Sequence, residues 1–412
     1  MKPLSFSFSP TDVYLVAVSG GPDSTALLNM LRNLKCPLVI CHVNYHKRKE
    51  SDSEQAMIGR YAEKWHIPYH VLDTSSMKPE GNFQAWAREV RYAFFQKQYR
   101  AYRAAGLFVA HQEDDLLETY LMQKKRGGIV SYYGLKEETE LLGMRVLRPL
   151  LNFTKAELED YCRRNRLDYS IDASNLRDDY LRNRIRHCVV EKMSSSDRAA
   201  LRKEIDENNA LLAEHNRVAE VFLKKEVKKI DEFARLDART QDIVLYRFIG
   251  ERLPFISRRL SSSRIGEIKK ILFSKKPNNR ILLYPPFYFV RSYDRFDISE
   301  SINSFDYAYI INEPQRVDTK EFSVDLRQDT APLNIFSYSY PLTIRNARRG
   351  DAVLFGSIRK RVNRILIDEK VPSERRKTYP VIVDCRGEIV YIPLYRSIRQ
   401  KDIANKILFV IK

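Results

Sequence analysis

The stretch from Val16 to Leu28, VAVSGGPDSTALL, decides the fold. Its opening residues are apolar, which is typical of a buried strand, and its closing residues indicate a helix. Between them, Ser19 to Ser24 (SGGPDS) bring two glycines, a proline, an acid and two hydroxyls to a strand-to-helix turn. The composition of this turn predicts that it carries chemistry as well as a change of direction.

The SGGPDS turn has the properties of a phosphate cradle. Its glycines let a ligand approach the backbone amides, the following helix adds its positive end, and its serines add hydroxyl donors. Pro22 suits a first helical turn, where its missing N–H needs no partner. Asp23 would repel phosphate unless Mg²⁺ lay between them, since carboxylates and phosphates share this ion. The expected phosphate-binding residues are Ser19, Gly20, Gly21, Pro22, Asp23 and Ser24.

The sequence excludes one common use of such a turn. A kinase-type loop of the form GxxxxGK[ST] is absent, and so is its lysine. The turn should therefore not hold a γ-phosphate for transfer. The plain alternative is an ordinary glycine-containing turn, which would explain two glycines but not the whole hexapeptide behind a buried strand.

Residues 1 to about 195 alternate strand-like and helix-like segments. The patterns Ser51-x-x-Glu54 and Thr154-x-x-Glu157 predict capping boxes at the starts of two helices. Alternation of this kind predicts an α/β fold with a doubly wound parallel sheet. The predicted strands are Val13–Val18, Leu38–Val43, Tyr69–Leu72 and Leu107–Ala110.

The composition changes near residue 195. After it we expect charged helices, a hairpin from Ile281 to Ile298 turned at Pro285-Pro286, and then short strands such as Leu342–Ile344, Val381–Val383 and Ile389–Ile392. The predicted domains are a catalytic α/β domain at 1–195, a mainly helical domain at 196–330 and a small basic α/β domain at 331–412.

The chain is strongly basic. Its 412 residues include 71 Lys and Arg against 53 Asp and Glu, a formal net charge of +18. The segment 342–412 alone has 17 basic and 7 acidic side chains, a local charge of +10. Because each cation placed on a phosphate releases counterions, this concentration favours a nucleic-acid partner over a diffuse solubility charge.

Cysteine use and hydropathy exclude other classes. The five cysteines form no CxxC pair, which argues against a zinc ribbon, a redox motif or a disulfide scaffold and favours a reducing compartment. No apolar run approaches the ~18–20 residues that span a bilayer, and the first residues lack a signal-peptide pattern. We expect a cytoplasmic protein with no membrane partner.

The motifs resemble a known family. SGGPDS resembles the signature of the PP-loop, or N-type, ATP pyrophosphatases, whose fold is adenine nucleotide α hydrolase-like. Within that superfamily the chain is similar to the tRNA(Ile)-lysidine synthases, and the similarity covers most of the first 190 residues in the family's order. The further matching segments are HVN (42–44), GNFQAWAREVRY (81–92), AHQEDDLLET (110–119), LRPLL (147–151) and DASNLRDDYLRNRIRH (172–187), with looser matches at RNARRGD (345–351) and KRVNRILIDEKVP (360–372).

The resemblance implies a ligase that converts ATP to AMP and pyrophosphate. It would join free L-lysine to the wobble cytidine of the CAU-anticodon isoleucine tRNA, through an adenylated cytidine, and so form lysidine. This would change codon recognition from AUG to AUA and tRNA identity from methionine to isoleucine. The target base must first leave its stack, as chemistry on a base requires. The basic C-terminal region would hold the tRNA, and the oligomeric state stays open, a homodimer included.

The resemblance also implies roles for side chains. The SGGPDS turn would hold the leaving pyrophosphate, with Mg²⁺ at Asp23 and Asp115. His111 and Asp115 would face the same way if their segment is helical, and His111 could donate to a phosphate or to the cytosine oxygen. One or two arginines of the RNRIRH segment would stabilise charge at the α-phosphate, and they would point alternately if that segment is extended. The predicted catalytic residues are Asp23, His111, Asp115 and Arg182.

Some assignments are secondary. Asp172 is expected to hold the incoming lysine, and Arg88 and Arg91 to join the phosphate site or contact RNA. Asp114 and Glu118 are further acidic candidates. The family usually has a histidine where this chain has a tyrosine after its HVN segment, so no acid-base role is expected there. Both tryptophans are expected in the core.

Three alternatives stay open from the sequence. A tRNA base thiolase of the same superfamily would use paired cysteines, which this sequence lacks. An amidotransferase-linked synthetase would need an ammonia source, and the basic C-terminal region fits RNA better. A non-catalytic tRNA-binding protein would not need the acidic and histidine residues of the predicted site.

Overall fold

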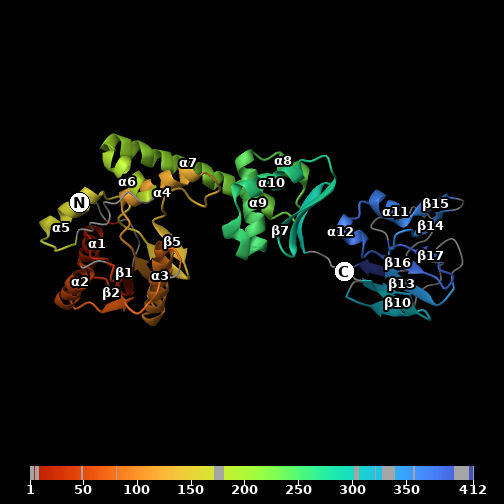
Figure 1. Ribbon diagram of the computed structural model, residues 1–412, viewed down its shortest axis with the longest axis horizontal. Helices are drawn as coiled ribbons and strands as arrows, with labels where there is room; N and C mark the ends of the chain where they lie inside the picture. Colours follow the sequence, from red (N-terminus) through yellow and green to blue (C-terminus); the bar gives the residue numbers. More distant parts are fainter. Residues whose placement is uncertain are drawn as a thin grey trace. The chain divides into compact units, whose positions relative to one another are not determined.

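The computed structural model shows two compact units, Met1–Glu214 and His215–Lys412 (Figure 1). The predicted division into three domains stays a prediction. The predicted lysine-binding residue, Asp172, lies outside the described residues. The structure describes residues 4, 9–47, 50–79, 81–170, 181–300, 306–320, 322–326, 339–355, 358–393 and 408–411.

The first unit is built on a six-stranded sheet with the order β3-β2-β1-β4-β6-β5. Neighbouring strands are parallel except β5, which pairs antiparallel with β6 at one edge. The prediction of a doubly wound parallel sheet is confirmed, with an antiparallel edge strand added. The strands are β1 (Tyr14–Ala17), β2 (Leu38–Asn44), β3 (Tyr69–Asp73), β4 (Gly106–Phe108), β5 (Glu138–Leu141) and β6 (Met144–Leu147).

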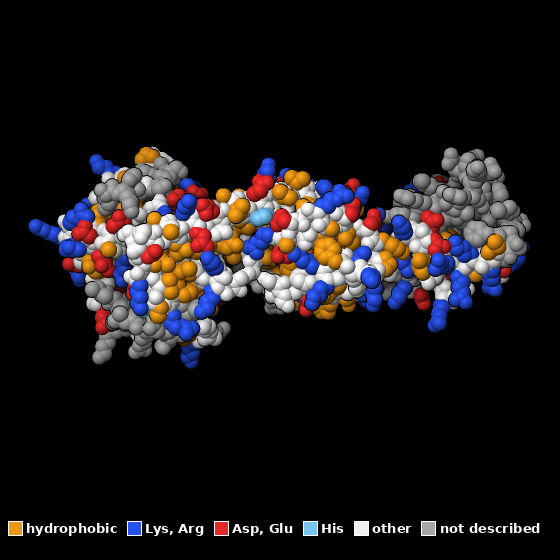
Figure 2. Space-filling view, turned by 90° about the horizontal axis from the view of Figure 1, so that it is seen from above, with side chains coloured by type: hydrophobic (Ala, Val, Ile, Leu, Met, Phe, Trp, Pro, Cys, Tyr) orange, Lys and Arg blue, Asp and Glu red, His pale blue; other side chains and the backbone are white. Residues whose placement is uncertain are grey.

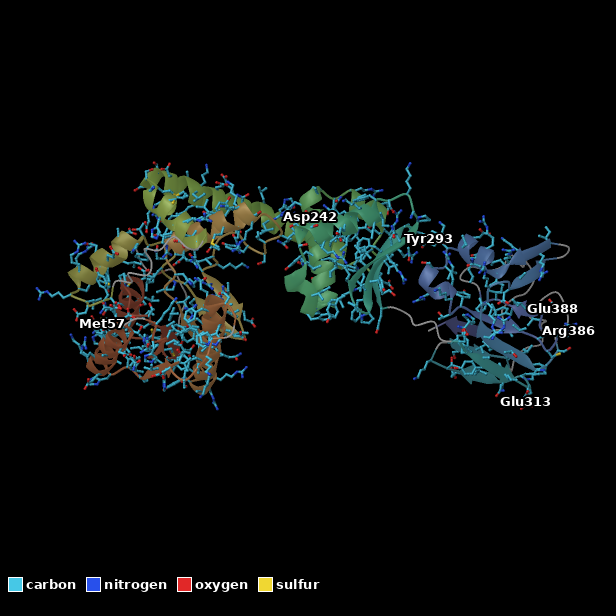
Figure 3. The ribbon with its side chains drawn as sticks, in the orientation of Figure 1. Met57, Asp242, Tyr293, Glu313, Arg386 and Glu388 are labelled. Atoms are coloured by element: carbon cyan, nitrogen blue, oxygen red, sulfur yellow. The ribbon has the colours of Figure 1, made fainter. Side chains whose placement is uncertain are left out.

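Helices cover both faces of this sheet. Side chains alternate along a strand, so Val16 packs into the core under α1, α2 and α5, whereas Leu15 packs into the core under α3. Met57, labelled in Figure 3, is buried in the first of these cores. The helices are α1 (Pro22–Asn33), α2 (Ser51–Trp65), α3 (Phe83–Ala101), α4 (Glu113–Arg126), α5 (Lys155–Arg164), α6 (Leu181–Cys188) and α7 (Ser195–Leu223), with a 3-10 turn η2 (Val190–Lys192).

Of the two predicted capping boxes, one is confirmed and one is wrong. Thr154 accepts a hydrogen bond from the Glu157 amide at 3.2 Å, and the Glu157 carboxylate accepts one from the Thr154 amide at 2.8 Å. Ser51 caps nothing, because α2 begins one residue earlier than predicted: Glu50 is its N-cap and Ser51 is already helical.

The second unit begins with helices and a three-stranded antiparallel sheet. The predicted hairpin is confirmed, with its turn at Pro285-Pro286 between β7 and β8. Phenylalanines from the helices and strands pack against one another in this part, among them Phe248 and Phe296 with ring centroids 5.4 Å apart. The elements are α8 (Ile230–Ala234), α9 (Ala238–Arg252), η3 (Pro254–Arg259), α10 (Ser262–Leu272), β7 (Asn278–Tyr284), β8 (Phe287–Ser292) and β9 (Arg295–Glu300).

The remainder of the second unit is rich in β-strands. The predicted strands near residues 342, 381 and 389 are all present and share one antiparallel sheet, which a strand from Ala308 to Ile311 joins at its edge. The β16–β17 turn, where Figure 3 labels Arg386 and Glu388, is held by the Asp384 carboxylate, which accepts from both of their amides at 3.0 Å. The elements are β10 (Ala308–Ile311), β11 (Arg316–Asp318), β12 (Phe322–Asp325), β13 (Leu342–Asn346), β14 (Ala352–Phe355), β15 (Ile358–Arg361), α11 (Val362–Asp368), α12 (Ser373–Arg376), β16 (Pro380–Val383), β17 (Ile389–Tyr391) and β18 (Leu408–Ile411).

Two expectations from composition concern the whole chain. All five cysteines are free thiols, three of them buried. Among the residues that the structure describes, no helix is both long and apolar enough to cross a membrane. Figure 2 shows lysine and arginine side chains at many places on the visible face, interspersed with acidic ones, rather than gathered in one patch.

Candidate active site

The SGGPDS turn lies where β1 ends and α1 begins, at the carboxyl edge of the parallel sheet. Gly20 has φ +92°, a conformation that other residues rarely adopt, and a Cβ there would lie 3.4 Å from the Cβ of Glu54. Gly21 is the N-cap of α1, and Pro22 follows at the first helical position, as predicted. The backbone geometry therefore requires glycine at position 20 and accommodates proline at position 22.

The N-terminus of α1 offers free donors to the space in front of it. No side chain of the described residues caps this helix. The first helical amides have no partner within a helix, and the helix dipole adds positive potential there, so the end of α1 suits an anion. Ser24 plays a different part: its hydroxyl oxygen accepts from the amides of Ser19 and Gly20, both at 3.2 Å, and donates to the Gly21 carbonyl at 3.1 Å. Ser24 thus holds the turn in shape.

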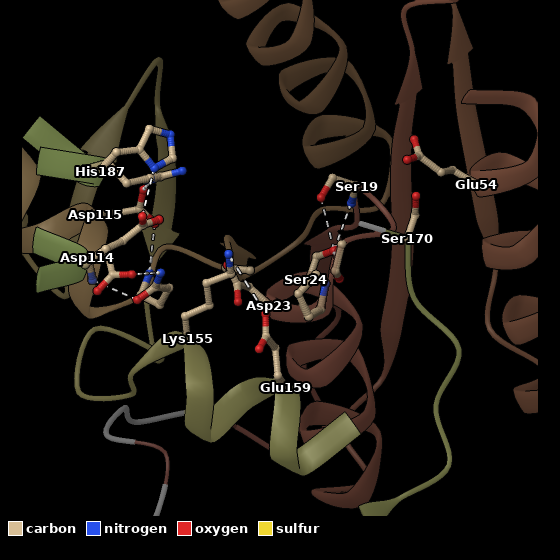
Figure 4. Close-up of a pocket in the computed structure, with 16 residues that line it drawn as sticks. Ser19, Asp23, Ser24, Glu54, Asp114, Asp115, Lys155, Glu159, Ser170 and His187 are labelled. Atoms are coloured by element: carbon tan, nitrogen blue, oxygen red, sulfur yellow. Dashed lines mark hydrogen bonds and ion pairs between the residues drawn. The ribbon is translucent and has the colours of Figure 1, made fainter. Parts of the chain in front are cut away.

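A cavity of about 410 Å³ opens in front of this turn. Figure 4 shows Asp23 and Lys155 between the serines of the turn and the acidic residues at the start of α4. Its lining combines the turn, α4, the first turns of α5 and the end of α6. The residues are Ser19, Gly21, Pro22, Asp23, Ser24, Glu54, Ala110, Gln112, Asp114, Asp115, Lys155, Glu159, Ser170, Arg186, His187 and Glu191.

Asp23 is an acid of this cavity with a strongly raised pKa. Burial and then repulsion from Asp115 raise the pKa of Asp23 to about 7, although the nearby Lys155 acts in the opposite direction. Its Oδ1 is buried and has no hydrogen-bond partner among the described residues. A buried carboxylate oxygen without a donor, next to a second carboxylate, is a place where a bound cation would relieve both desolvation and repulsion.

Asp115 belongs to a cluster of acids and arginines between α4 and α6. Arg182 donates to Asp115 and to Glu118, in each case at 2.8 Å. Arg186, one helical turn later, also donates to Glu118 and lies 3.4 Å from the same Asp115 oxygen. Because the RNRIRH segment is helical and not extended, Arg182 and Arg186 share one face, and the alternation expected for an extended segment does not apply. Arg184 makes neither contact.

His111 lies beside a second, smaller cavity and not on α4. The helix begins at Glu113 with Gln112 as its N-cap, so His111 precedes it and the assumed helical spacing to Asp115 does not hold. Asp115 instead closes a capping box, in which its carboxylate accepts from the Gln112 amide at 3.1 Å. The smaller cavity has a volume of about 210 Å³, and its lining is Ala17, Val18, Ser19, Ser24, Cys41, Val43, Tyr45, Arg91, Tyr92, Phe95, Val109, Ala110 and His111.

Arg148 donates a hydrogen bond to His111 and, after burial, is the next cause of its lowered pKa. Its Nε donates to His111 Nδ1 at 3.2 Å, and the rest of its guanidinium donates to the Lys136 carbonyl at 2.9 Å and to Thr139 at 3.0 Å. Burial, followed by repulsion from Arg148 and other arginines, lowers the pKa of His111 to about 3. Since Nδ1 accepts, the proton of the neutral ring is on Nε2, and His111 is a neutral hydrogen-bond donor at physiological pH.

The structure brings most predicted residues to one edge of the sheet. Asp23 and Asp115 face the larger cavity, and Arg182 contacts Asp115 from α6 but lines neither cavity. Two residues with no predicted role also belong here: Lys155, which lines the larger cavity, and Arg148. Arg148 stands in the LRPLL segment, which could have pointed to it, whereas nothing in the sequence around Lys155 distinguishes it from a surface lysine.

The acids alone do not form a closed metal site. Within the described part of the chain, no three His, Cys, Asp or Glu side chains are grouped so that they could hold an ion by themselves. Mg²⁺ typically binds through one or two carboxylates together with substrate phosphates and water. The unpartnered Oδ1 of Asp23, which belongs to the phosphate-type turn, fits that pattern. The Asp115 oxygens already accept from Gln112 and Arg182, so they are less available.

Comparison with known proteins agrees with this geometry. Residues 4–193 match the model of the PP-loop domain family. The tRNA(Ile)-lysidine synthase of Mycoplasma mycoides subsp. mycoides SC is 28% identical over 410 residues, which cover 93% of this chain and 97% of that protein. The tRNA(Ile)-lysidine synthase of Ureaplasma parvum serovar 3 is 38% identical over 248 residues, 57% of this chain and 72% of that protein.

Solved structures add only a distant likeness. A U34-tRNA thiolase from Methanococcus maripaludis aligns with 50% of this chain and 73% of its own, at 14% identity and a TM-score of 0.41, and no functional inference rests on it. The relatives with matching sequence over most of their length carry the assignment. The chain belongs to the tRNA(Ile)-lysidine synthase family, ATP-dependent tRNA-modifying ligases with a PP-loop domain.

Proposed function

We propose that this chain joins free L-lysine to the wobble cytidine of an isoleucine tRNA with a CAU anticodon, and that the cavities described above carry out both steps. In the first step the cytosine carbonyl oxygen bonds to the α-phosphorus of ATP, and pyrophosphate leaves. In the second step, the ε-amino nitrogen of lysine bonds to the ring carbon that carries this oxygen. The bond between that carbon and the oxygen breaks, and the oxygen leaves as part of AMP. The observation that carries this proposal is the uncapped N-terminus of α1, which includes Asp23 and opens into the same cavity as Asp115.

The larger cavity fits the pyrophosphate end of ATP. The amides at the start of α1 and the Ser19 hydroxyl supply donors, and Lys155 and Arg186 supply positive charge from α5 and α6. Charge builds up on the leaving pyrophosphate during the first step, so donors that are already in place stabilise it without reorganisation. Arg186 lines this cavity and Arg182 does not, so we propose Arg186 for direct phosphate contact. Arg182 would position Asp115 and Glu118.

The smaller cavity fits a nucleobase. Its walls are mostly apolar and aromatic, with Val43, Tyr92 and Phe95 among them, and it shares Ser19, Ser24 and Ala110 with the larger cavity. A base held here would lie next to phosphates held there. His111 lines the smaller cavity, next in sequence to the shared Ala110, as a neutral donor, and we propose that its Nε2–H contacts the oxygen that carries the adenylate.

Mg²⁺ is part of this proposal through Asp23. The residues that would hold it are Asp23 first and Asp115 second, together with phosphate oxygens. When bound, the ion would neutralise charge on the phosphates and orient them. In its absence the raised pKa of Asp23 keeps part of this carboxyl protonated near neutral pH.

We further propose that the basic segment 342–412 contacts the tRNA backbone. Arg348, Arg349 and Arg361 are exposed in the structure, as phosphate contact requires. The five free thiols fit a reducing compartment, which supports the cytoplasm as the place of the reaction. A homodimer stays a prediction.

The experiment is direct. Purified protein is incubated with ATP, labelled lysine and the CAU-anticodon isoleucine tRNA, and label is sought in the RNA. We expect label in RNA and pyrophosphate release that requires both tRNA and lysine for turnover. A thiolase or an ammonia-dependent synthetase would leave the RNA without labelled lysine, and a non-catalytic binder would release no pyrophosphate.

A further inference from the structure

The aromatic side chains at the start of α3 form a cluster that the proposed chemistry does not use. Tyr45 follows β2, and its ring lies edge-on to Phe83 and Trp86, with centroids 6.0 Å and 6.4 Å away. Phe83 and Trp86 are 5.6 Å apart. Tyr45 is half-buried, and Phe83 and Trp86 are also only half-buried, so Trp86 is not the core residue that the sequence suggested.

This aromatic cluster is fixed in place by its own hydrogen bonds. The Tyr45 hydroxyl donates to the Ala87 carbonyl at 2.8 Å, which ties the residue after β2 to the second turn of α3. Asn82 caps that helix by accepting from the amides of Gln84 and Ala85. The rings are therefore presented on a rigid scaffold, as a preorganised binding surface requires.

The cluster adjoins the active site and is bordered by positive charge. Tyr45 also lines the smaller cavity, together with Arg91 and His111. The ammonium of Lys47 lies 4.5 Å from the centroid of Phe83. The Arg88 guanidinium lies 4.7 Å from the ring centroid of Tyr92, another residue of the cavity wall. Aromatic rings with a lysine and an arginine packed over them have the composition of a single-stranded nucleic-acid site.

We propose that Phe83 and Trp86 form a stacking platform for unpaired anticodon-loop nucleotides next to the target cytidine. The inference rests on the proposed function, because that function brings an anticodon loop to this edge of the sheet. Loop bases are splayed and stacked on aromatic rings when proteins recognise single-stranded RNA. Lys47, which lies over Phe83, and Arg88, which lies over Tyr92, would supply positive charge to the accompanying phosphates. The platform would hold the loop open while the target base enters the active site.

The chain offers a direct optical test. Its two tryptophans are Trp65 and Trp86, so a Trp65→Phe variant has Trp86 as its only tryptophan. Trp65 stacks on Tyr61 with centroids 4.6 Å apart, and phenylalanine keeps that stack. The full-length variant is titrated with the CAU-anticodon isoleucine tRNA and, separately, with ATP. We expect tRNA to quench Trp86 fluorescence, and a tRNA with abasic sites flanking the target cytidine to bind with little quenching.

A second measurement uses activity. Trp86→Ala should raise the KM for tRNA about 5- to 150-fold and leave the KM for ATP unchanged, whereas Trp86→Phe should retain most of the affinity. Binding of tRNA without a change in Trp86 fluorescence would overturn the stacking platform, and so would quenching by ATP alone. Failure of the protein to bind this tRNA at all would instead contradict the proposed function.

Discussion

Arg148 donates a hydrogen bond to His111, 37 residues away in the sequence, and thereby leaves the proton of that ring on Nε2. Each residue follows a strand, His111 after β4 and Arg148 after β6, and these strands are parallel neighbours, with Phe108 opposite Leu147. Parallel strands bring their carboxyl ends to one edge, where ligands of doubly wound sheets bind. The pair therefore fixes a neutral donor at the edge where the phosphate turn also lies.

Replacing Arg148 should change the pH dependence of catalysis. Arg148→Met removes the second-largest cause that lowers the pKa of His111, so this pKa should rise from about 3 towards its ordinary value. Activity of the wild type should show no loss attributable to His111 between pH 6 and pH 8. The variant should lose about tenfold or more in kcat and gain an acid limb, measured as pyrophosphate release against pH.

The control for this variant is structural. Arg148 is 7% exposed, and its guanidinium also donates to the Lys136 carbonyl and to Thr139, so methionine leaves both acceptors unpaired and the melting temperature of the variant is measured beside that of wild type. The same melting temperature as wild type, with an unchanged pH profile, would show that Arg148 does not act on His111.

Asp23→Asn should make the ligand-free protein more stable at alkaline pH. Folding raises the Asp23 pKa from 3.8 to about 7, so its contribution to stability is fully present below pH 3.8 and is lost as the pH rises through 7. The free energy of unfolding that is lost in this way is at most about 4 kcal/mol. Asparagine does not ionise, so the variant avoids this loss, and its advantage in melting temperature should be larger at pH 8 than at pH 5. The exposed Asp12→Asn is the matched control.

The same Asp23 variant should be inactive. If Asp23 holds Mg²⁺ against the phosphates, Asp23→Asn should lower pyrophosphate release by about a thousandfold. Equilibrium dialysis should also show weaker Mg²⁺ binding in the presence of ATP. Full turnover in a correctly folded variant would remove Asp23 from the metal site.

Lys155 tests whether the larger cavity holds phosphates. Lys155→Met removes a cation that lines this cavity and that favours the ionised form of Asp23. We expect kcat/KM for ATP to fall about tenfold to a hundredfold, because charge on the phosphates loses a fixed partner. Lys64→Met, at an exposed position on α2, should have no effect, and equal effects of both variants would contradict the assignment.

The C-terminal arginines test the RNA surface. Neutralising Arg348, Arg349 and Arg361 should weaken tRNA binding and lower the slope of log K against log salt by about 2 to 3 if all three contact phosphates. A control with equal charge is provided by Lys97, Arg100 and Arg103, which are exposed near the end of α3. Unchanged affinity and slope in the first variant would refute the contact.

Local sequence patterns predicted much of the fold. Strands β1 to β4 are short apolar runs, and the helices between them carry apolar residues at helical spacing, so their type follows from nearby residues alone. The β5–β6 hairpin was not predicted, because Glu138–Leu141 is polar and its pairing depends on a neighbouring strand. The shared direction of His111 and Asp115 depended on a helix that includes both residues, but α4 begins at Glu113, and a glutamine in the N-cap gives a weak signal for that start.

The sequence predicted the part of the candidate site whose residues are contiguous in the chain. The SGGPDS turn can be interpreted without the rest of the chain. The Arg148–His111 bond, the shared face of Arg182 and Arg186 and the position of Lys155 all depend on which segments meet at the sheet edge. Trp86 was expected in the core, but it is half-buried in an aromatic cluster, because the type of a residue alone does not distinguish a core position from a half-exposed one.

The central claim is that the SGGPDS turn holds the two outer phosphates of ATP as the leaving group. Product analysis tests this most directly: α-labelled and γ-labelled ATP are incubated with the protein, lysine and the CAU-anticodon isoleucine tRNA. We predict AMP and pyrophosphate in amounts equal to the lysine bound to RNA, with both products lost in Asp23→Asn. Formation of ADP and orthophosphate coupled to the modification would contradict the account.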